Sequence, residues 1–337
     1  MKAVGIIANP FSGKDIRRFT SCAFIVSNDE KENIVERMIL SMSKLGIEKI
    51  FLMPDTFCLN QNISNRVKKV DQVKSSIEIL DYLPQNCPED TLKAMTLMQA
   101  MDIGCMVILG GDGTARLAAK ARINVPVIPV STGTNNVYPY FLEGTSVGCA
   151  AAYLCHQGRP EIIPCDKLID VFINDRFVDV AIVDAVVSRD AYIGSRAIFE
   201  TDHIDEVIVC RTKADSIGFS AIIGCAQRCS DNDNFGLRTV IDTAGREVMV
   251  PIGAGQLLPV RTSEPVKMPL DEPYTCQKRY PGTVALDGER TVTFTQGDIL
   301  KFMITRKGGL RKVNINKLLS EAIDEGFFQS RNGNCLD

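Results

Sequence analysis

The sequence has no tryptophan and only two histidines, His156 and His203. A zinc site with histidine ligands and a Ser-His-Asp triad each need a positioned imidazole, so the sequence disfavours both. The twelve cysteines include no Cys-x-x-Cys pair. With no secretion signal to indicate an oxidising compartment, we expect reduced thiols, most of them acting as small core residues.

Long apolar runs and basic tracts are also missing. No window approaches eighteen apolar residues, so no membrane-spanning helix is predicted. The apolar run at residues 1–7 is too short for a signal peptide, and Asn9-Pro10 ends it. No cluster of Lys and Arg gives the footprint of a nucleic-acid-binding protein. The sequence therefore predicts a cytoplasmic protein that binds neither membranes nor nucleic acid.

The chain has 337 residues, 45% of them hydrophobic and 23% charged, with a net charge of −3. This balance is typical of a globular protein. The length is long for one core and suits two domains.

Residues 1–158 alternate predicted strands and helices, which is the order of an α/β domain with a doubly wound parallel sheet. Gly158 is placed to end the last helix. The predicted strands are 3–8, 49–53, 76–82, 105–109 and 126–130, and the predicted helices are 29–45, 64–73, 90–101, 115–122 and 145–157.

Residues 159–305 change to short strands and turns, which predicts a β-rich, sandwich-like domain. Asn174-Asp175-Arg176, Ala244-Gly245 and Asp287-Gly288 each lie between two predicted strands and are interpreted as hairpin turns. Residues 317–328 are predicted to form a terminal helix. We expect the segment of about residues 306–330 to rejoin the first domain.

The run Gly110-Gly111-Asp112-Gly113-Thr114 directly follows the predicted strand 105–109 and precedes a helix. Glycines let the backbone approach a ligand closely, and a helix N-terminus suits a phosphate. Asp112 would repel phosphate unless it holds a cation or takes a proton, and both roles belong to phosphoryl transfer. The alternative is an ordinary glycine turn in which Asp112 caps the helix.

Two further turns are predicted at the same edge of the sheet, after strands 3–8 and 126–130. They contain neither Gly-x-Gly-x-x-Gly nor a full Walker motif, which disfavours dehydrogenases and P-loop enzymes. The alternative is that they are polar loops rich in turn formers. The residues that they supply are Asn9, Ser12, Gly13, Gly133, Thr134, Asn135 and Asn136.

Together the three turns resemble the NAD kinase and diacylglycerol kinase superfamily, of which Gly-Gly-Asp-Gly-Thr is the most specific signature. Asn9-Pro10-x-Ser12-Gly13 and Gly133-Thr134-x-Asn136 resemble its lipid-kinase branch, and residues 286–289 are similar to its C-terminal Asp-Gly-Glu turn. Residues 7–18 and 131–137 are most similar to the ATP-NAD kinase-like acetoin catabolism proteins. The resemblance covers roughly residues 1–320 and implies an α/β domain followed by a β-rich one.

The resemblance implies ATP and Mg²⁺ as cofactors. Asp112 matches the family's essential aspartate, which activates the acceptor hydroxyl or organises magnesium. The glycines of the signature and Thr114 would line the phosphates. The full set of implied nucleotide-binding residues is Asn9, Ser12, Gly13, Gly110, Gly111, Gly113, Thr114, Gly133, Thr134, Asn135 and Asn136.

Further roles are implied for the second domain. Asp184 matches the carboxylate of a pair that holds the dinucleotide in NAD kinases, although Val183 replaces the usual asparagine; it could also be an outward-facing strand residue. Asp287 and Glu289 would bind magnesium, with exposed acids of a hairpin turn as the alternative. The family also implies a homo-oligomer, a dimer or a tetramer.

The chain departs from NAD kinases at residues 210–220. NAD kinases carry a Thr-Pro-Thr-Gly-Ser-Thr-Ala-Tyr stretch that binds the dinucleotide, and here the tyrosine and most of the hydroxyls are absent. This puts NAD in doubt as the acceptor. Arg211 and Lys213 are candidates for contacting an anionic acceptor, with plain surface charges as the alternative.

The leading hypothesis is an ATP-dependent kinase that phosphorylates a hydroxyl group of a small or nucleotide acceptor, with NAD to NADP as the default reaction. Asp112 would orient or deprotonate that hydroxyl. The first alternative is a non-catalytic nucleotide-binding regulator linked to acetoin catabolism. The second is a lipid kinase, for which no amphipathic helix rich in Lys and Arg is evident.

Overall fold

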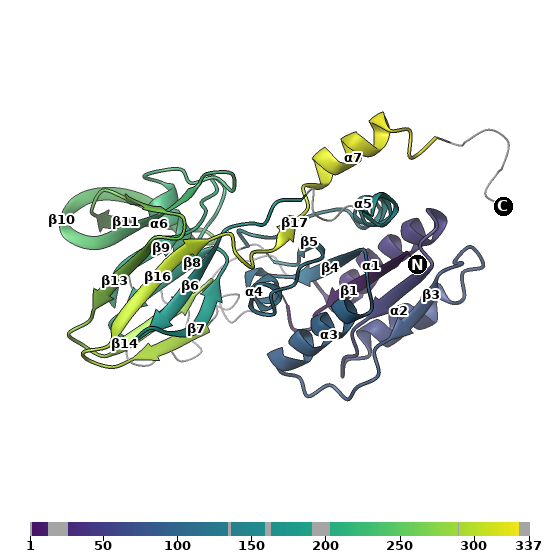
Figure 1. The fold of residues 1–337 in the computed structure, drawn as a ribbon, viewed down its shortest axis with the longest axis horizontal. Helices are drawn as coiled ribbons and strands as arrows, with labels where there is room; N and C mark the ends of the chain where they lie inside the picture. Colours follow the sequence, from purple (N-terminus) through teal and green to yellow (C-terminus); the bar gives the residue numbers. More distant parts are fainter. Residues whose placement is uncertain are drawn as a thin grey trace.

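The computed structural model describes residues 2–12, 26–133, 136–158, 163–190, 203–288 and 290–329. They form two domains that lie side by side (Figure 1). The first is a parallel sheet covered by helices and the second is built from antiparallel sheets, which confirms the predicted fold class. No helix in the described part of the chain is long and apolar enough to cross a membrane.

The first domain is built on a six-stranded parallel sheet in the order β17-β5-β4-β1-β2-β3. Its strands are β1 (Ala3–Ala8), β2 (Lys49–Leu52), β3 (Ser76–Ile79), β4 (Cys105–Gly110), β5 (Pro126–Ser131) and β17 (Arg311–Lys312). The strand order reverses direction between β1 and β4. Such a switch point is where sheets of this type bind ligands, outside the carboxyl ends of the strands.

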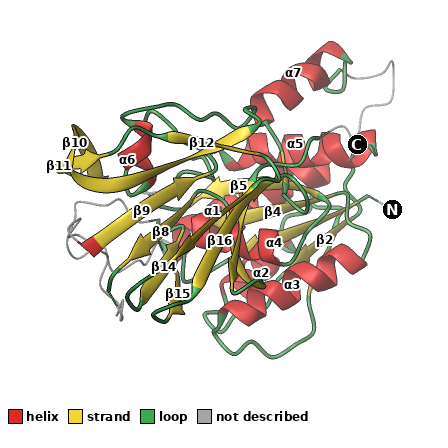
Figure 2. Ribbon diagram, turned by 60° about the vertical axis from the view of Figure 1, so that its left-hand side comes forward, coloured by secondary structure: helices red, strands yellow, loops and turns green. Residues whose placement is uncertain are grey.

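Helices cover both faces of this sheet (Figure 2). One face packs against α1 (Asn28–Lys44), α2 (Leu59–Val67) and α5 (Gly144–Gln157), and the other against α3 (Pro88–Ala100) and α4 (Asp112–Lys120). Alternate residues of β1 divide between the two cores, since Val4 and Ile6 face the first group of helices and Ala3 and Ile7 the second.

Every helix of this domain begins before its predicted first residue, and the shift is largest for α2 and α4. Helix α2 was expected at 64–73 but begins at Leu59, because the Asp55 carboxylate accepts the N–H groups of Leu59 (3.0 Å) and Asn60 (2.9 Å) and thereby fixes its first turn. Helix α4 begins at Asp112 and not at residue 115. Gly113 and Thr114 therefore belong to the first turn of α4 and not to the loop before it.

The second domain is a sandwich of two antiparallel sheets, in agreement with the β-rich prediction. One sheet has the order β11-β10-β9-β8-β14-β15 with β12 paired to β10, and the other has the order β13-β16-β6-β7. Val187 and Leu286 from the first sheet share a core with Phe302 from the second. The elements are β6 (Leu168–Ile173), β7 (Arg176–Ala181), β8 (Asp184–Ser188), β9 (Ile204–Val209), α6 (Ser220–Gly224), β10 (Phe235–Gly253), β11 (Gln256–Thr262), β12 (Val266–Pro269), β13 (Pro273–Gln277), β14 (Gly282–Leu286), β15 (Arg290–Phe294) and β16 (Ile299–Thr305).

Two of the three predicted hairpin turns are confirmed, and the one at Ala244-Gly245 is wrong. Strand β10 runs unbroken through both residues and turns into β11 only at Gly255, which has a φ of +76°. Residues 242–245 form a bulge, since Ile241 and Arg246 both pair with Thr262. A Cβ on Gly245 would collide with the Thr262 carbonyl oxygen. The glycine is explained by close backbone approach and not by a turn.

The end of the chain lies on the first domain. β17 pairs in parallel with β5, and α7 (Ile315–Asp324) lies against α5. Past α7, the Phe327 ring contacts the Tyr153 ring of α5 edge-on, with 5.1 Å between their centroids. In chain order, the strands β6–β16 therefore lie between α5 and β17. The second domain is an insertion in the sequence of the first.

The packing of α1 on α5 depends on Gly148. A Cβ at this position would lie 2.5 Å from the Met38 carbonyl oxygen and would also collide with the Ser41 hydroxyl. We predict that Gly148→Val lowers the free energy of unfolding by about 1–3 kcal/mol, because overpacking forces the two helices apart. Urea denaturation measures the effect. Ser146→Ala, at an exposed position of the same helix, is the control, and equal stability of both variants would contradict the prediction.

Candidate nucleotide and acceptor site

Three turns lie together at the carboxyl edge of the first sheet, after β1, β4 and β5. The Asn9 N–H donates to the Leu109 carbonyl oxygen (3.4 Å), and the Thr132 N–H donates to the Gly110 carbonyl oxygen (3.3 Å). These bonds join each outer turn to the central one. The structure thus brings together the three segments from which the sequence predicted a phosphate site.

Asp112 is the first residue of α4 and is buried, with 6% of its surface exposed. Its two carboxylate oxygens accept the backbone N–H groups of Val137 (3.0 Å) and Tyr138 (2.8 Å). These two bonds fix the orientation of the side chain. Asp112 therefore holds the segment after β5 against the N-terminus of α4.

Asn136 reinforces the same junction. Its side-chain N–H group donates to the Ser131 hydroxyl (2.8 Å) and to the Gly133 carbonyl oxygen (3.2 Å), and its Oδ1 accepts the Asp112 N–H (3.3 Å). A Cβ on Gly111 would lie 2.8 Å from Asn136 Oδ1. Gly111 thus leaves room for the Asn136 side chain, a packing reason for this glycine that stands beside its predicted role in phosphate binding.

The turn after β1 is tied to α4 and to the turn after β5. Asn9 donates from Nδ2 to the Thr114 hydroxyl (3.4 Å) and accepts the Phe11 N–H (2.9 Å). The Ser12 hydroxyl donates to the Asn9 carbonyl oxygen (2.8 Å) and accepts from the Thr132 hydroxyl (3.0 Å). The predicted residues Asn9, Ser12 and Thr114 therefore lie in one hydrogen-bonded group.

Lys31 is a residue of this site that the sequence analysis did not identify. It lies on the first turn of α1, its side chain is fully buried, and its ammonium group donates to the carbonyl oxygens of Asn9 (3.1 Å), Pro10 (3.2 Å) and Ser12 (2.8 Å). Buried lysines are rare unless paired. The charge therefore fixes the path of the turn, and the sequence signal was a lysine at a core-facing position of an amphipathic helix.

A pocket of about 270 Å³ opens beside these turns. Its wall includes Asn9 and Pro10 from the turn after β1 and Gly113 and Thr114 from the first turn of α4. The remaining lining residues are Phe11, from the turn after β1, and residues from the segments after β2 and β3 and from α3 and α4: Met53, Pro54, Asp55, Pro84, Asn86, Cys87, Pro88, Asp90, Thr91 and Leu117. The start of α4 offers backbone N–H groups and a partial positive charge to an anion in this pocket.

Asp287 has a different environment from the one its predicted magnesium role suggests. Its fully buried carboxylate accepts the N–H groups of Ile182 (3.0 Å), Val183 (2.8 Å) and Asp184 (3.1 Å). Burial raises the pKa of Asp287 to about 6, against the opposing influence of the Arg116 guanidinium. Asp287 therefore holds the link between β7 and β8, where the predicted acceptor residue Asp184 is also buried. The exposed-acid alternative is therefore wrong for Asp287, and the outward-facing alternative is wrong for Asp184.

Arg116, also absent from the sequence predictions, connects α4 to the second domain. Its side chain is fully buried and lies 3.1 Å from the Asp179 carboxylate on β7 and 3.9 Å from that of Asp287. It also donates to the Val180 carbonyl oxygen (3.3 Å). Since Asp112 and Arg116 lie one turn apart, α4 carries both residues predicted to bind phosphate and the contact between the domains.

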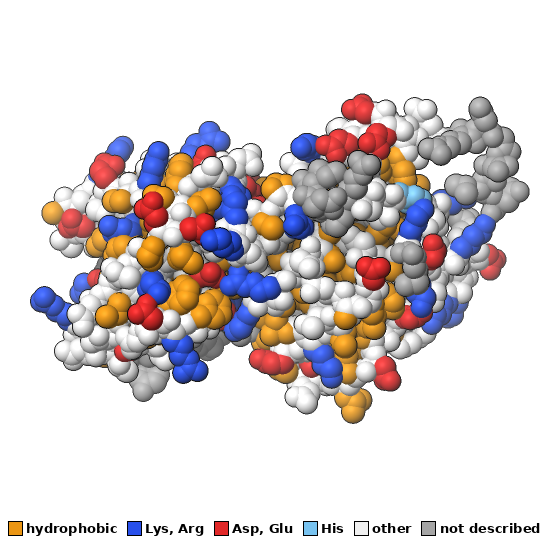
Figure 3. Space-filling view, viewed as in Figure 1, with side chains coloured by type: hydrophobic (Ala, Val, Ile, Leu, Met, Phe, Trp, Pro, Cys, Tyr) orange, Lys and Arg blue, Asp and Glu red, His pale blue; other side chains and the backbone are white. Residues whose placement is uncertain are grey.

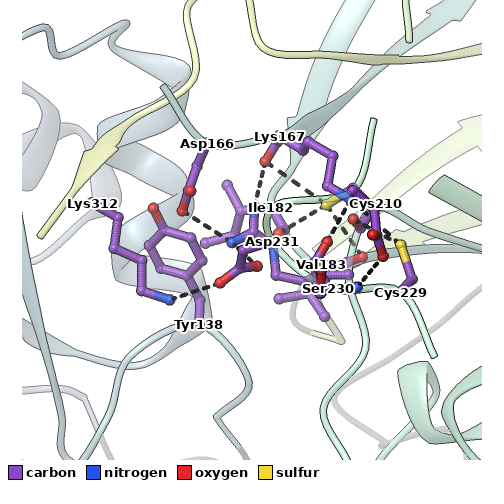
Figure 4. A network of polar contacts seen from close by, with 12 residues as sticks. Tyr138, Asp166, Lys167, Ile182, Val183, Cys210, Cys229, Ser230, Asp231 and Lys312 are labelled. Carbon is purple, nitrogen blue, oxygen red and sulfur yellow. Dashed lines mark hydrogen bonds and ion pairs between the residues drawn. The ribbon is translucent and has the colours of Figure 1, made fainter. Parts of the chain in front are cut away.

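A second polar network joins the domains around Tyr138 (Figure 4). Arg211, predicted either to contact an acceptor or to be a surface charge, is 1% exposed and pairs with Asp166 (3.0 Å) and Asp231 (2.9 Å). The surface alternative is therefore wrong for Arg211. Lys312 on β17 approaches Asp231 from the other side, at 3.8 Å.

Four predicted site residues, Gly13, Thr134, Asn135 and Glu289, lie outside the described residues. Within the described ranges, no three His, Cys, Asp or Glu side chains are grouped so that they could hold a metal ion. The ten described cysteines are free thiols. Any magnesium at this site would therefore need most of its ligands from the nucleotide and from water, as is usual for Mg²⁺ with a nucleotide.

Comparison with known proteins agrees with this geometry. Residues 4–157 match the family model of the ATP-NAD kinase N-terminal domain, so the first domain is of the NAD kinase class. Residues 167–307 match the acetoin catabolism protein X C-terminal domain. The chain is 32% identical over 307 residues to acetoin catabolism protein X of Cupriavidus necator, covering 88% of this chain and 85% of that protein. It therefore belongs to the acetoin catabolism protein X family.

We predict that Lys31→Met loosens the turn at residues 9–12. Methionine fills a similar volume but removes the ammonium donor from three carbonyl oxygens, of which that of Asn9 keeps the Ser12 hydroxyl, and this should lower the free energy of unfolding by about 1–3 kcal/mol. The same change should weaken binding of Mg-ATP, because the turn lines the pocket. Urea denaturation and calorimetric titration measure the two effects. Lys69→Met, at an exposed lysine, should change neither; unaltered stability and affinity in Lys31→Met would refute the assigned role.

Proposed function

We propose that this protein is an ATP-dependent kinase that transfers the γ-phosphate to a hydroxyl group, with NAD as the default acceptor. The observation that supports the proposal most strongly is the position of Asp112. It is a buried carboxylate at the first residue of α4, held by two backbone N–H groups and next in sequence to residues that line a pocket. A carboxylate so close to a phosphate-binding helix N-terminus has a chemical use as a proton acceptor.

The nucleotide is proposed to enter the pocket beside α4. Its phosphates would lie against Gly113 and Thr114, where the helix dipole and backbone N–H groups favour negative charge. Asn9 would contribute its side chain from the turn after β1. The exposed rings of Phe11 and Phe57, with centroids 5.0 Å apart, offer an apolar surface near the pocket to which a base could bind.

Magnesium fits this proposal as a partner of the phosphates and not as a resident metal. Mg²⁺ usually retains waters and uses substrate phosphates with one or two carboxylates. Asp112, at the N-terminus of α4, would be such a ligand only in place of its role as proton acceptor, since a carboxylate that binds the ion is a poor base. The ion would neutralise charge on the β- and γ-phosphates. Asp287 is a weaker candidate ligand, since three backbone N–H groups already bind its carboxylate.

The chemistry assigned to Asp112 is general base catalysis. Asp112 would accept the proton of the acceptor hydroxyl as its oxygen bonds to the γ-phosphorus and the bond from that phosphorus to the ADP oxygen breaks. The proton then passes from Asp112 to solvent, and the products are ADP and a phosphate monoester. The N–H groups of Val137 and Tyr138 position the carboxylate for this step.

A regulatory protein that binds nucleotide without turnover is the second candidate. It is favoured by residues 210–220, which lack the dinucleotide-binding pattern of NAD kinases, and by Arg211 in that stretch, which is buried in ion pairs with Asp166 and Asp231. The name of the Cupriavidus necator relative places that protein in acetoin catabolism without stating a reaction. A role in that pathway for this chain is part of the second proposal.

The decisive assay measures NADP formation and ADP release with Mg-ATP, NAD and a set of other acceptors that includes small hydroxyl compounds and lipid vesicles. We predict that turnover requires an acceptor and falls by about a hundredfold or more in Asp112→Asn, because the proton acceptor is lost. Asp102→Asn is the matched control, an exposed aspartate with a φ of +54° that asparagine tolerates.

Asparagine can accept only one of the two N–H bonds that Asp112 receives, so thermal unfolding must show that the variant is folded at the assay temperature. Unchanged turnover in folded Asp112→Asn would contradict the kinase assignment. If the protein binds Mg-ATP but forms no ADP with any of the acceptors, the regulatory function is favoured.

A further inference from the structure

A ladder of alternating cations and tyrosine rings lies between the two domains. Arg211 and Lys312 lie over the Tyr138 ring, at 4.8 Å and 4.3 Å from its centroid. Lys312 and Lys213 lie over the Tyr140 ring, at 4.8 Å and 3.6 Å. Arg211 and Lys213 come from the second domain, whereas both tyrosines and Lys312 belong to the first. The ladder therefore exists only where the domains meet.

The charges on this ladder are unevenly balanced. Arg211 pairs with both Asp166 and Asp231. Lys312 reaches Asp231 only at 3.8 Å, and its buried Nζ has no hydrogen-bond acceptor among the described residues. Within the described part of the chain, the Lys213 ammonium has no ion-pair or hydrogen-bond partner. The cation without a partner is therefore the one at the Tyr140 end, where the ring is 47% exposed.

Lys213 and Lys312 both contact the Tyr140 ring, so their positive charges lie close enough to repel each other. Burial, and next the Lys312 charge, lower the pKa of Lys213 to about 8, while the carboxylates of Asp112, Asp215 and Asp231 act in the opposite direction. Burial and then Arg211 lower the pKa of Lys312. Two ammonium groups held together in a partly buried place are unfavourable unless an anion joins them. Figure 3 shows Lys and Arg side chains gathered along this boundary between the domains.

The ladder is also connected to Asp112. Tyr138, the ring between Arg211 and Lys312, donates its backbone N–H to the Asp112 carboxylate. The Asp112 charge acts on both lysines, so the three groups lie within electrostatic range of one another. The 270 Å³ pocket includes neither lysine in its wall. The lysines and the proposed nucleotide pocket thus flank the start of α4 as two separate sites.

We propose that Lys213 and Lys312 bind the anionic group of the phosphate acceptor, which is a small hydroxyl compound carrying a carboxylate or a phosphate. The inference rests on the proposed kinase function and defines the class of its acceptor. An anion that contacts both ammonium groups at the exposed Tyr140 ring relieves their repulsion and keeps the acceptor within electrostatic range of Asp112. Because the lysines come from different domains, binding also requires the domain arrangement that Arg116 maintains.

The test is the rate at which individual lysines are acetylated at pH 8 in purified full-length protein, measured by peptide mass spectrometry. Sodium phosphate and sodium acetate are the probes, with sodium chloride at equal ionic strength as the reference. We expect an anion to slow acetylation of Lys213 in proportion to occupancy, roughly tenfold at ten times its dissociation constant. Exposed Lys69 serves as the internal control. Stronger protection by phosphate than by acetate would identify a phosphorylated acceptor, and the reverse a carboxylic acid.

Single substitutions test whether Lys213 and Lys312 bind the same anion. Lys312→Met should remove the protection of Lys213, because loss of a charge-assisted contact weakens anion binding roughly tenfold or more. Lys307→Met, at a lysine whose side chain is 83% exposed, should leave the protection intact. Thermal unfolding of each variant verifies folding, and phosphate protection of Lys312 in Lys213→Met at wild-type strength would contradict a shared site.

The acetylation experiment tests the anion site separately from the kinase activity. Lys213 acetylation that neither anion slows would overturn the inference. Protection by Mg-ATP alone would overturn it as well and assign the lysines to the nucleotide, with the kinase assignment intact. Protection by phosphate in a protein that neither binds nor consumes Mg-ATP would support the anion site and refute the kinase.

Discussion

The arrangement of the site depends on the Asp112 carboxylate and the two backbone N–H groups that bind it. Those bonds hold the segment after β5 against the first residue of α4. The position of Tyr138, and with it the stack of rings and cations between the domains, follows from this constraint. The same carboxylate is the group to which the proposed chemistry assigns the proton. In this account, the Asp112 side chain both holds the backbone after β5 in place and accepts the proton in the proposed reaction.

Helix α4 extends this constraint into the second domain. One turn after Asp112, the buried Arg116 side chain meets Asp179 on β7 and lies near Asp287, which in turn binds the backbone between β7 and β8. Removing one partner from such a buried group would leave an uncompensated charge, which is strongly unfavourable. The two domains are thus joined by directional ionic contacts as well as by the returning strand β17.

Strong local patterns in the sequence predicted much of this structure. The strands of the first domain are short apolar runs followed by turn residues, and Asp287-Gly288 formed its predicted hairpin, with both residues at positive φ. The three turns could be placed together because parallel strands share one carboxyl edge. The hairpin turn predicted at Gly245 is wrong, because this glycine lies within β10 and permits the close approach of β11.

Residues whose roles depend on distant partners could not be predicted. The helical pattern puts Lys31 on the core-facing side of α1, but only the fold places the carbonyl oxygens of residues 9–12 around it. Lys312 lies outside every motif and reaches Tyr138 and Tyr140 because β17 returns to the first sheet after the whole second domain. The start of α2 depended on Asp55, whose carboxylate lies in the loop before it. Such contacts join elements that are far apart along the chain, so residue spacing does not predict them.

Hydrogen–deuterium exchange of the full-length protein with and without Mg-ATP tests most directly whether the start of α4 is a nucleotide site. The account predicts that Mg-ATP slows exchange of the backbone amides at residues 9–12 and in the first turns of α4, since these segments line the pocket and would contact the phosphates. Unchanged exchange in both segments at saturating Mg-ATP, or protection confined to the second domain, would contradict it.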